Sequence, residues 1–201
     1  MAKDAYYFLI PVAALAVLFF LLNIYIFGAA FVLLAGFVAF FFRDPEREIP
    51  KDPSAIVSPA DGRIISVETS QSGTRLSIFL SVLDVHINRA PIAGVVLEKN
   101  YRPGKFVVAY DSRASVENEQ VVMTIGQDQR QLTFALIAGI VARRIRVWKN
   151  QGESVNTGDR IGLIRFGSRV DVFLPPEVQL LVRKGDRVYG GTSIIAQWRD
   201  S

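Results

Sequence analysis

The chain has 201 residues, enough for one domain with its own hydrophobic core and a short appendage. It contains no cysteine, which excludes disulfide bonds, thiolate nucleophiles and cysteine-based metal sites. Its net charge of +4 is not gathered into a basic stripe interleaved with aromatic residues, so we expect no nucleic-acid partner. Half of the residues are hydrophobic and the mean hydropathy is +0.28, and much of this excess lies near the N-terminus.

The first element is an uncharged stretch over residues 6–42. As one continuous helix it would be about 55 Å long, whereas the hydrocarbon core of a bilayer is about 30 Å thick. Asn23 and Gly28 offer a break, so the sequence predicts two helical arms, near 6–22 and 29–42, joined by a turn. Both a spanning and a re-entrant hairpin are compatible with arms of this length.

Positive residues flank this stretch and are absent from its centre. Lys3 precedes it, and Arg43, Arg47 and Lys51 follow it. The positive-inside rule then puts both ends, and the domain that follows, on the cytoplasmic face of the cell membrane. We therefore expect residues 1–44 to form an α-helical hairpin associated with the membrane.

The remainder of the chain predicts a linker and one compact, mainly β domain with short helices. Three prolines make residues 45–55 a stiff, extended linker. Residues 56–201 contain short β-branched and aromatic runs separated by turn residues. Asp61-Gly62 predicts a hairpin between two of these runs, and 138–147 is the best candidate for a short helix. The expected strands cover 56–57, 63–67, 76–80, 94–97, 121–125 and 132–137.

Gly167-Ser168 lies in the middle of an apolar, strand-like run. Glycine inside a strand marks a bulge or a place where another group approaches the backbone closely. Ser168 places a potential nucleophile beside an unhindered carbonyl. The pair is therefore compatible with a simple bulge and with an attack of Ser168 on its own preceding peptide bond.

His86 is the only histidine in the chain. Imidazole is the side chain whose unperturbed pKa lies near neutrality, so His86 is the simplest general base for Ser168. A carboxylate can orient such a ring, and Asp61 and Asp84 are the candidates by residue type. Asp61 is explained equally well as a turn residue, and sequence spacing does not choose between the two.

Several short motifs occur in a fixed order along the chain. They are FRDPER (42–47), SPADGR (58–63), DVHINRAP (84–91), ENE (117–119), IAG (137–139) with ARRI (142–145), and FGSRVD (166–171). Together they resemble the short-form, bacterial and archaeal type of phosphatidylserine decarboxylase proenzyme. The resemblance runs from the hairpin to the C-terminus.

This resemblance implies an enzyme that cuts itself between Gly167 and Ser168. Ser168 would attack the Gly167 carbonyl, with His86 as the base and Asp61 orienting His86. Residues 1–167 would become the β chain and residues 168–201 the α chain, forming a heterodimer that can assemble into a homo-oligomer. Ser168 would become a covalent pyruvoyl group, and no metal is expected.

The implied reaction is the decarboxylation of phosphatidylserine to phosphatidylethanolamine. The pyruvoyl group would form a Schiff base with the serine amine and act as the electron sink. Arg89 is a candidate for binding the lipid phosphate or the substrate carboxylate, although an ordinary surface role is equally compatible. Many long-form members carry a second histidine where this chain has Leu83, so any role of that histidine is absent here or filled by another group.

Two alternatives remain open. The first is the same chemistry on another serine-headgroup lipid, such as archaetidylserine. The second is a membrane-anchored serine hydrolase that uses Ser168, His86 and Asp61. The absence of a Gly-x-Ser-x-Gly elbow around Ser168 counts against the hydrolase.

Overall fold

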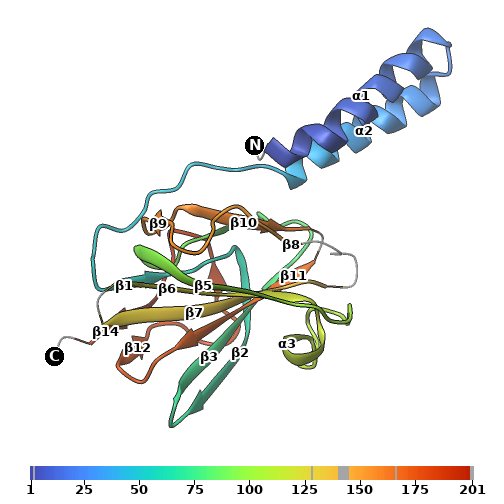
Figure 1. Ribbon diagram of the computed structural model, residues 1–201. Helices are drawn as coiled ribbons and strands as arrows, with labels where there is room; N and C mark the ends of the chain where they lie inside the picture. Colours follow the sequence, from blue (N-terminus) through green and yellow to red (C-terminus); the bar gives the residue numbers. More distant parts are fainter. Residues whose placement is uncertain (2, 128, 140–144, 166, 200–201) are drawn as a thin grey trace. The chain divides into compact units, whose positions relative to one another are not determined.

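The computed structural model describes residues 1, 3–127, 129–139, 145–165 and 167–199. The chain divides into two compact units, Met1–Glu46 and Arg47–Ser201 (Figure 1). The first unit is helical and the second is mainly β.

The N-terminal unit is a helical hairpin. A 3-10 turn, η1 (Lys3–Ala5), leads into α1 (Tyr6–Leu21), and α2 (Tyr25–Phe41) returns alongside it. Asn23 turns the chain with φ +60°, a left-handed conformation that asparagine adopts more readily than most residues. The predicted break at Asn23 is therefore confirmed.

Gly28 does not break the hairpin but lies inside α2, which begins at Tyr25 rather than at residue 29. A Cβ at Gly28 would lie 3.0 Å from ring carbons of Phe20, so glycine lets the two helices approach closely. The ring of Phe19 stacks on those of Phe27 and Phe31 with centroid distances of 5.4 Å. Aromatic packing therefore holds the pair together.

The outward side chains of this hairpin are large and apolar. Tyr7, Leu21, Ile26 and Leu33 are each at least 74% exposed. The helices α1 and α2 have 16 and 17 residues. Within the described part of the chain, no helix is both long and apolar enough to cross a membrane.

The second unit confirms the predicted mainly β class and the predicted strand positions. It also contains one short helix, α3 (Ala114–Glu117). The strands are β1 (Ala55–Val57), β2 (Gly62–Ser70), β3 (Gly73–Leu80), β4 (Ile87–Arg89), β5 (Gly94–Arg102), β6 (Gln120–Gln127), β7 (Arg130–Ile137), β8 (Ile145–Val147), β9 (Ser154–Val155), β10 (Arg160–Ile164), β11 (Ser168–Leu174), β12 (Val178–Leu180), β13 (Arg187–Val188) and β14 (Ile194–Trp198).

These strands form three sheets. The largest has eight antiparallel strands in the order β13-β2-β3-β11-β7-β6-β5-β9, and it curls around the main core (Figure 1). Two three-stranded sheets, β1-β14-β12 and β4-β10-β8, complete the unit. Strand β11 therefore has a hydrogen-bonded neighbour on each side, β3 and β7.

The main core follows the alternation of side chains along the central strands. Val170 and Val172 of β11 lie opposite Ile78 and Leu76 of β3, and all four are fully buried. Leu80, opposite Ser168, belongs to the same cluster. Successive side chains of a strand point to opposite faces, so residues 168, 170 and 172 all face this core.

Two local predictions are wrong. Asp61-Gly62 makes a bend but no hairpin, because β1 pairs with β14 and β2 pairs with β3 and β13. The partner of Ile56 is Ala196, at the far end of the chain, where a local pattern carries no information. Residues 145–147, expected in a short helix, form strand β8 on β10, while residues 140–144 lie outside the described residues.

Candidate functional site

Ser168 is the first residue of β11 and faces the main core. Its side chain is fully buried. Its Oγ makes no hydrogen bond within the described part of the chain. Buried hydroxyl groups nearly always have a partner, so an unpartnered one indicates a functional role. The structure thus presents the predicted nucleophile without a competing hydrogen bond.

The carbonyl of Gly167 lies in a gap that only glycine can provide. The β7–β11 ladder pairs Ile137 with Arg169, so Gly139 faces Gly167 two residues further on. A Cβ at Gly139 would lie 2.1 Å from the Gly167 oxygen, which no real structure tolerates. Gly167 itself has φ +67°, in the left-handed region that strongly favours glycine. Two glycines therefore place the carbonyl that precedes Ser168.

His86 lies on a segment that is tied to the Ser168 segment at two points. Leu80 pairs with Ser168, and the carbonyl of His86 accepts a 3.3 Å hydrogen bond from the Ile164 N–H. The two segments therefore meet at Leu80 and Ser168 and again at His86 and Ile164. His86 is fully buried, and its partner Ile164 belongs to the same core that Ser168 faces.

The contact at Nδ1 assigns the tautomer of His86. This nitrogen lies 2.9 Å from the backbone carbonyl of Asp84. A carbonyl oxygen can only accept, so Nδ1 carries the proton in the neutral ring. Nε2 is then the nitrogen that takes up a proton, as a general base requires.

Asp84 orients His86 through its backbone, while its carboxylate shapes the preceding turn. The carboxylate accepts a 2.8 Å hydrogen bond from the Ser81 N–H and forms an ion pair with Arg187. Asp84 is buried, and its charge raises the pKa of the half-exposed Arg187. Arg187 thereby fixes the turn that carries His86.

Asp61 is held by groups other than the imidazole. Arg47 Nη2 donates to both carboxylate oxygens, at 2.9 and 2.8 Å, and the Gly190 N–H donates at 2.8 Å. The hydrogen bonds described for Asp61 do not include one from His86. The predicted role of Asp61 in orienting His86 therefore stays a prediction.

Arg89 belongs to a different surface of β4. It follows Asn88 in β4, hence lies on the opposite face of the strand from Asn88, and its Nη1 donates to the Gly158 carbonyl at 2.9 Å. With Lys149 and Arg160 it lines a pocket of about 310 Å³. A cationic pocket suits a phosphate, but the assignment of Arg89 to the lipid phosphate stays a prediction.

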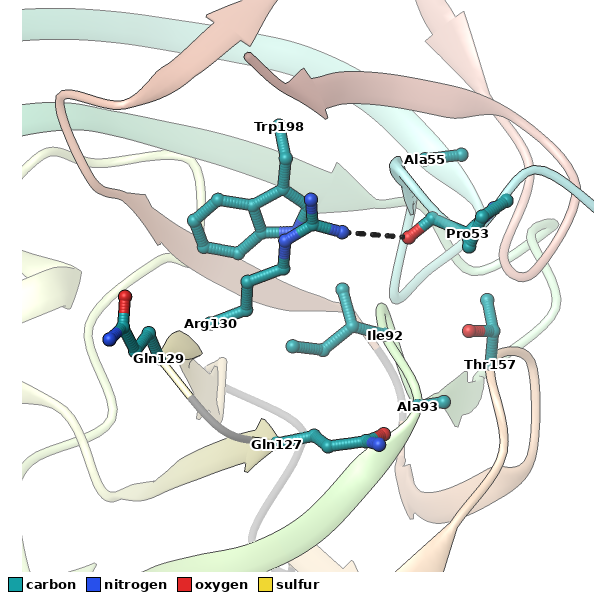
Figure 2. Close-up of a pocket in the computed structure, with 9 residues that line it drawn as sticks. All are labelled: Pro53, Ala55, Ile92, Ala93, Gln127, Gln129, Arg130, Thr157 and Trp198. Atoms are coloured by element: carbon teal, nitrogen blue, oxygen red, sulfur yellow. Dashed lines mark hydrogen bonds between the residues drawn. The ribbon is translucent and has the colours of Figure 1, made fainter. Parts of the chain in front are cut away.

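Figure 2 shows the residues that line a larger pocket, of about 560 Å³. This pocket lies away from Ser168. Arg130 lines it at the tip of the β6–β7 hairpin, whereas Ser168 begins beside the opposite end of β7. The Arg130 guanidinium is 5.8 Å from the Trp198 ring centroid and donates a 3.4 Å hydrogen bond to the Pro53 carbonyl. None of the predicted site residues is among the lining residues, which are Pro53, Ala55, Ile92, Ala93, Gln127, Gln129, Arg130, Thr157 and Trp198.

A buried ion pair supports the strand directly behind Ser168. Arg169 Nε donates to Asp171 at 2.7 Å, and its Nη2 donates to Ser77 Oγ at 2.7 Å. The Asp111 carbonyl accepts from Arg169 at 3.2 Å, and Ser115 Oγ donates to Asp171 at 2.6 Å. Sequence reasoning missed this network because charged residues such as Arg169 and Asp171 usually lie on the surface, and only the folded structure shows that both are buried.

Among the described residues, no group of three or more histidine, aspartate or glutamate side chains could hold a metal ion. The groups that the predicted site offers are a hydroxyl at Ser168, an imidazole at His86 and the peptide carbonyl of Gly167. This combination suits nucleophilic attack on a carbonyl carbon.

Comparison with known proteins identifies the family of this chain. The family model for phosphatidylserine decarboxylase matches residues 34–196. A phosphatidylserine decarboxylase proenzyme of Solibacter usitatus is 49% identical over 175 residues, covering 87% of this chain and 85% of the relative. Proenzymes of the same name from Symbiobacterium thermophilum and Carboxydothermus hydrogenoformans are 43% and 42% identical, covering 98% of this chain and 94% and 96% of the relatives. The chain belongs to the phosphatidylserine decarboxylase family.

Proposed function

We propose that this protein is a proenzyme that cuts itself between Gly167 and Ser168 and then decarboxylates phosphatidylserine to phosphatidylethanolamine. The observation that carries the proposal is the placement of Ser168. Its Oγ is buried without a hydrogen-bond partner in the described chain, next to a carbonyl that lies in the gap at Gly139. These residues fit the formation of a pyruvoyl group at position 168.

In the proposed maturation, His86 Nε2 takes the Oγ proton of Ser168 as this oxygen attacks the Gly167 carbonyl carbon. The C–N bond between Gly167 and Ser168 breaks, its nitrogen is protonated, and an ester through Oγ joins the two parts. A base then removes the Cα proton of residue 168, the Cβ–Oγ bond breaks, and Gly167 leaves as a carboxylate. The resulting dehydroalanine tautomerises to an imine, and water replaces its nitrogen as ammonia, which leaves a pyruvoyl group.

Burial of the site favours this outcome over simple hydrolysis. Ser168 and His86 are both fully buried in the uncut chain. Water that reached the ester would cleave it and leave an ordinary serine at the new N-terminus. Exclusion of water therefore directs the ester toward elimination.

The cut ends stay in place because β11 is held independently of the bond that breaks. It pairs with β3 along seven residues and with β7 along five. The buried Arg169–Asp171 pair adds hydrogen bonds to Ser77 and Ser115. The products are therefore proposed to remain together as a heterodimer.

When present, the pyruvoyl group supplies a carbonyl that takes up the serine amine and accepts the electron pair released as carbon dioxide leaves. The chain itself provides His86, whose segment runs beside residue 168. We assign to His86 the return of a proton to the substrate carbon after carbon dioxide has left. The Asp84 carbonyl holds its ring in the orientation required.

We also propose that the hairpin enters the membrane from its cytoplasmic face. The helices α1 and α2 are about 24 and 26 Å long, and their outward side chains are apolar. Burial of this surface in lipid removes it from water. A membrane anchor suits an enzyme whose substrate is itself a membrane lipid.

The first prediction concerns the cut. Purified wild-type protein should show two masses, for residues 1–167 and 168–201, the smaller with a ketoacyl N-terminus. It should convert phosphatidylserine to phosphatidylethanolamine with release of carbon dioxide. Ser168→Ala should remain one inactive chain, whereas Ser154→Ala, at an exposed serine, should behave as wild type. Active protein that consists of a single full-length chain would disprove the proposal.

The second prediction concerns the base. His86→Ala should slow self-cleavage by about 10²- to 10⁴-fold, the usual contribution of a general base, so uncut chain accumulates on a denaturing gel. Asp61→Asn should slow it less, and Asp84→Asn tests the other carboxylate in parallel. Cleavage at the wild-type rate in His86→Ala would exclude His86 as the base, and the same result in Asp61→Asn would exclude an orienting role for Asp61.

The third prediction concerns Gly139. The added methyl group of Gly139→Ala must displace the Gly167 carbonyl, since its Cβ would otherwise lie 2.1 Å from the carbonyl oxygen. We expect self-cleavage to slow at least about tenfold, because small misplacements of reacting atoms are costly. Gly36→Ala is the matched control, since a Cβ at Gly36 has no neighbour within 4 Å. Normal cleavage kinetics in folded Gly139→Ala would show that the gap does not position the carbonyl.

The fourth prediction concerns the membrane. The protein should stay with vesicles in high salt and require detergent, because salt screens charges but does not weaken apolar burial. Leu33→Arg should weaken retention, whereas Val116→Arg, at an exposed residue of α3, should not. Release of wild-type protein by salt alone would argue against insertion. Because the chain has no cysteine, a single cysteine at exposed Ser154 reports the orientation, and labelling from outside intact cells would contradict a cytoplasmic domain.

A further inference from the structure

Asn88 is a second buried polar residue without a hydrogen-bond partner. It lies in β4 and is fully buried. Neither its Oδ1 nor its Nδ2 forms a hydrogen bond within the described part of the chain. A buried amide that makes none of its hydrogen bonds destabilises the fold, so its presence requires an explanation.

The strand register places Asn88 on the same face as the site. His86 directly precedes β4, and the strand alternation continued back from Asn88 to residue 86 gives the two side chains the same direction. The carbonyl of His86 is bound by Ile164, whose side chain packs in the core that Ser168 faces. By this alternation the buried side chains of His86 and Asn88 leave the sheet on the side of Ile164, which packs in the core that Ser168 faces.

Arg89 does not occupy this interior. Its side chain leaves the opposite face of β4 and binds the Gly158 carbonyl. On the face of β4 that His86 shares, the group that can donate a hydrogen bond to an anion without carrying a charge is the Asn88 amide.

The chemistry of the substrate matches an amide better than a guanidinium. The serine headgroup presents a carboxylate, which accepts hydrogen bonds, and this charge disappears as carbon dioxide leaves. A charged partner would stabilise the carboxylate strongly before the reaction and lose that stabilisation in the transition state. A neutral amide orients the carboxylate with a smaller penalty.

We propose that Asn88 binds the carboxylate of the serine headgroup through Nδ2 and so helps the enzyme to select its substrate. This inference rests on the proposed function. It also accounts for product release, because the ethanolamine headgroup has no carboxylate and lacks this contact. The buried amide then costs stability in the free protein and is satisfied when substrate is bound.

The test uses processed enzyme with glycerophosphoserine and glycerophosphoethanolamine as soluble probes. Borohydride traps each probe on the 168–201 chain, and intact mass measures the trapped fraction against probe concentration. Asn88→Leu should raise the glycerophosphoserine concentration required for half-maximal trapping about 10- to 100-fold, as expected for the loss of one hydrogen bond to a charged group. The glycerophosphoethanolamine concentration required for half-maximal trapping should stay within about twofold of the wild-type value.

Stability provides an independent readout. Leucine has the same number and branching of side-chain heavy atoms as asparagine and no polar atoms, so Asn88→Leu should self-cleave normally and, where the larger methyl groups fit, melt about 2–4 °C higher than wild type. Asn88→Ala adds no volume and gives the same probe comparison if leucine does not fit. Asn100→Leu, at an exposed amide of β5, should change neither the binding of the probes nor the melting temperature.

Three results would overturn the assignment of Asn88. They are unchanged affinity for both probes in Asn88→Leu and Asn88→Ala, an equal loss for both probes, and a failure of these variants to self-cleave while they remain folded. The last result would place Asn88 in maturation instead. Failure of the proposed function is a separate outcome, since wild-type protein would then show no cut or no decarboxylation.

Discussion

The buried pair of Arg169 and Asp171 is the constraint on which the site depends. Both side chains are at most 2% exposed, so their charges must be satisfied within the protein. A buried pair is tolerated only where further hydrogen bonds complete it, and Ser77, Ser115 and the Asp111 carbonyl supply them. These contacts leave little freedom on that face of β11. Ser168, one residue before Arg169, is thereby directed toward the opposite face.

The two faces of strand β11 thus differ in function: one holds the strand in place and the other presents Ser168. Residues 169 and 171 are hydrogen-bonded to each other and to their neighbours and fix the strand, while residue 168 faces the core with its hydroxyl unpartnered in the described chain. Asn88, on β4, is likewise buried with its polar side-chain atoms unpartnered in the described chain. Such groups lower the stability of the fold, and proteins retain them where a reaction or a ligand requires them. Buried polar atoms without a hydrogen-bond partner therefore indicate the candidate site more directly than the pockets do.

Local sequence patterns predicted the elements well and their partners poorly. Apolar alternation located the central strands, and the Gly-Ser pair and the single histidine made Ser168 and His86 candidates, both of which the fold buries. The pattern failed at Asp61-Gly62 because the partner of β1 is β14, near the other end of the chain. It gave no sign that Asn88 is unpaired, since hydrogen bonding depends on what the fold brings near. The close approach of Gly139 to Gly167 could not be predicted either, because it depends on the register between β7 and β11.

The topology also requires folding to precede the proposed cleavage. In residues 168–201, β11 pairs with β3 and β7, β13 pairs with β2, and β14 pairs with β1. Arg187 and Gly190 further bind Asp84 and Asp61 of the larger fragment. A fragment this short cannot bury a core of its own. It acquires its structure only as part of the whole chain, so the reacting groups can meet only once that chain has folded. The proposed self-cleavage would then follow from the finished fold, since the strand pairs that hold residues 168–201 do not depend on the Gly167–Ser168 bond.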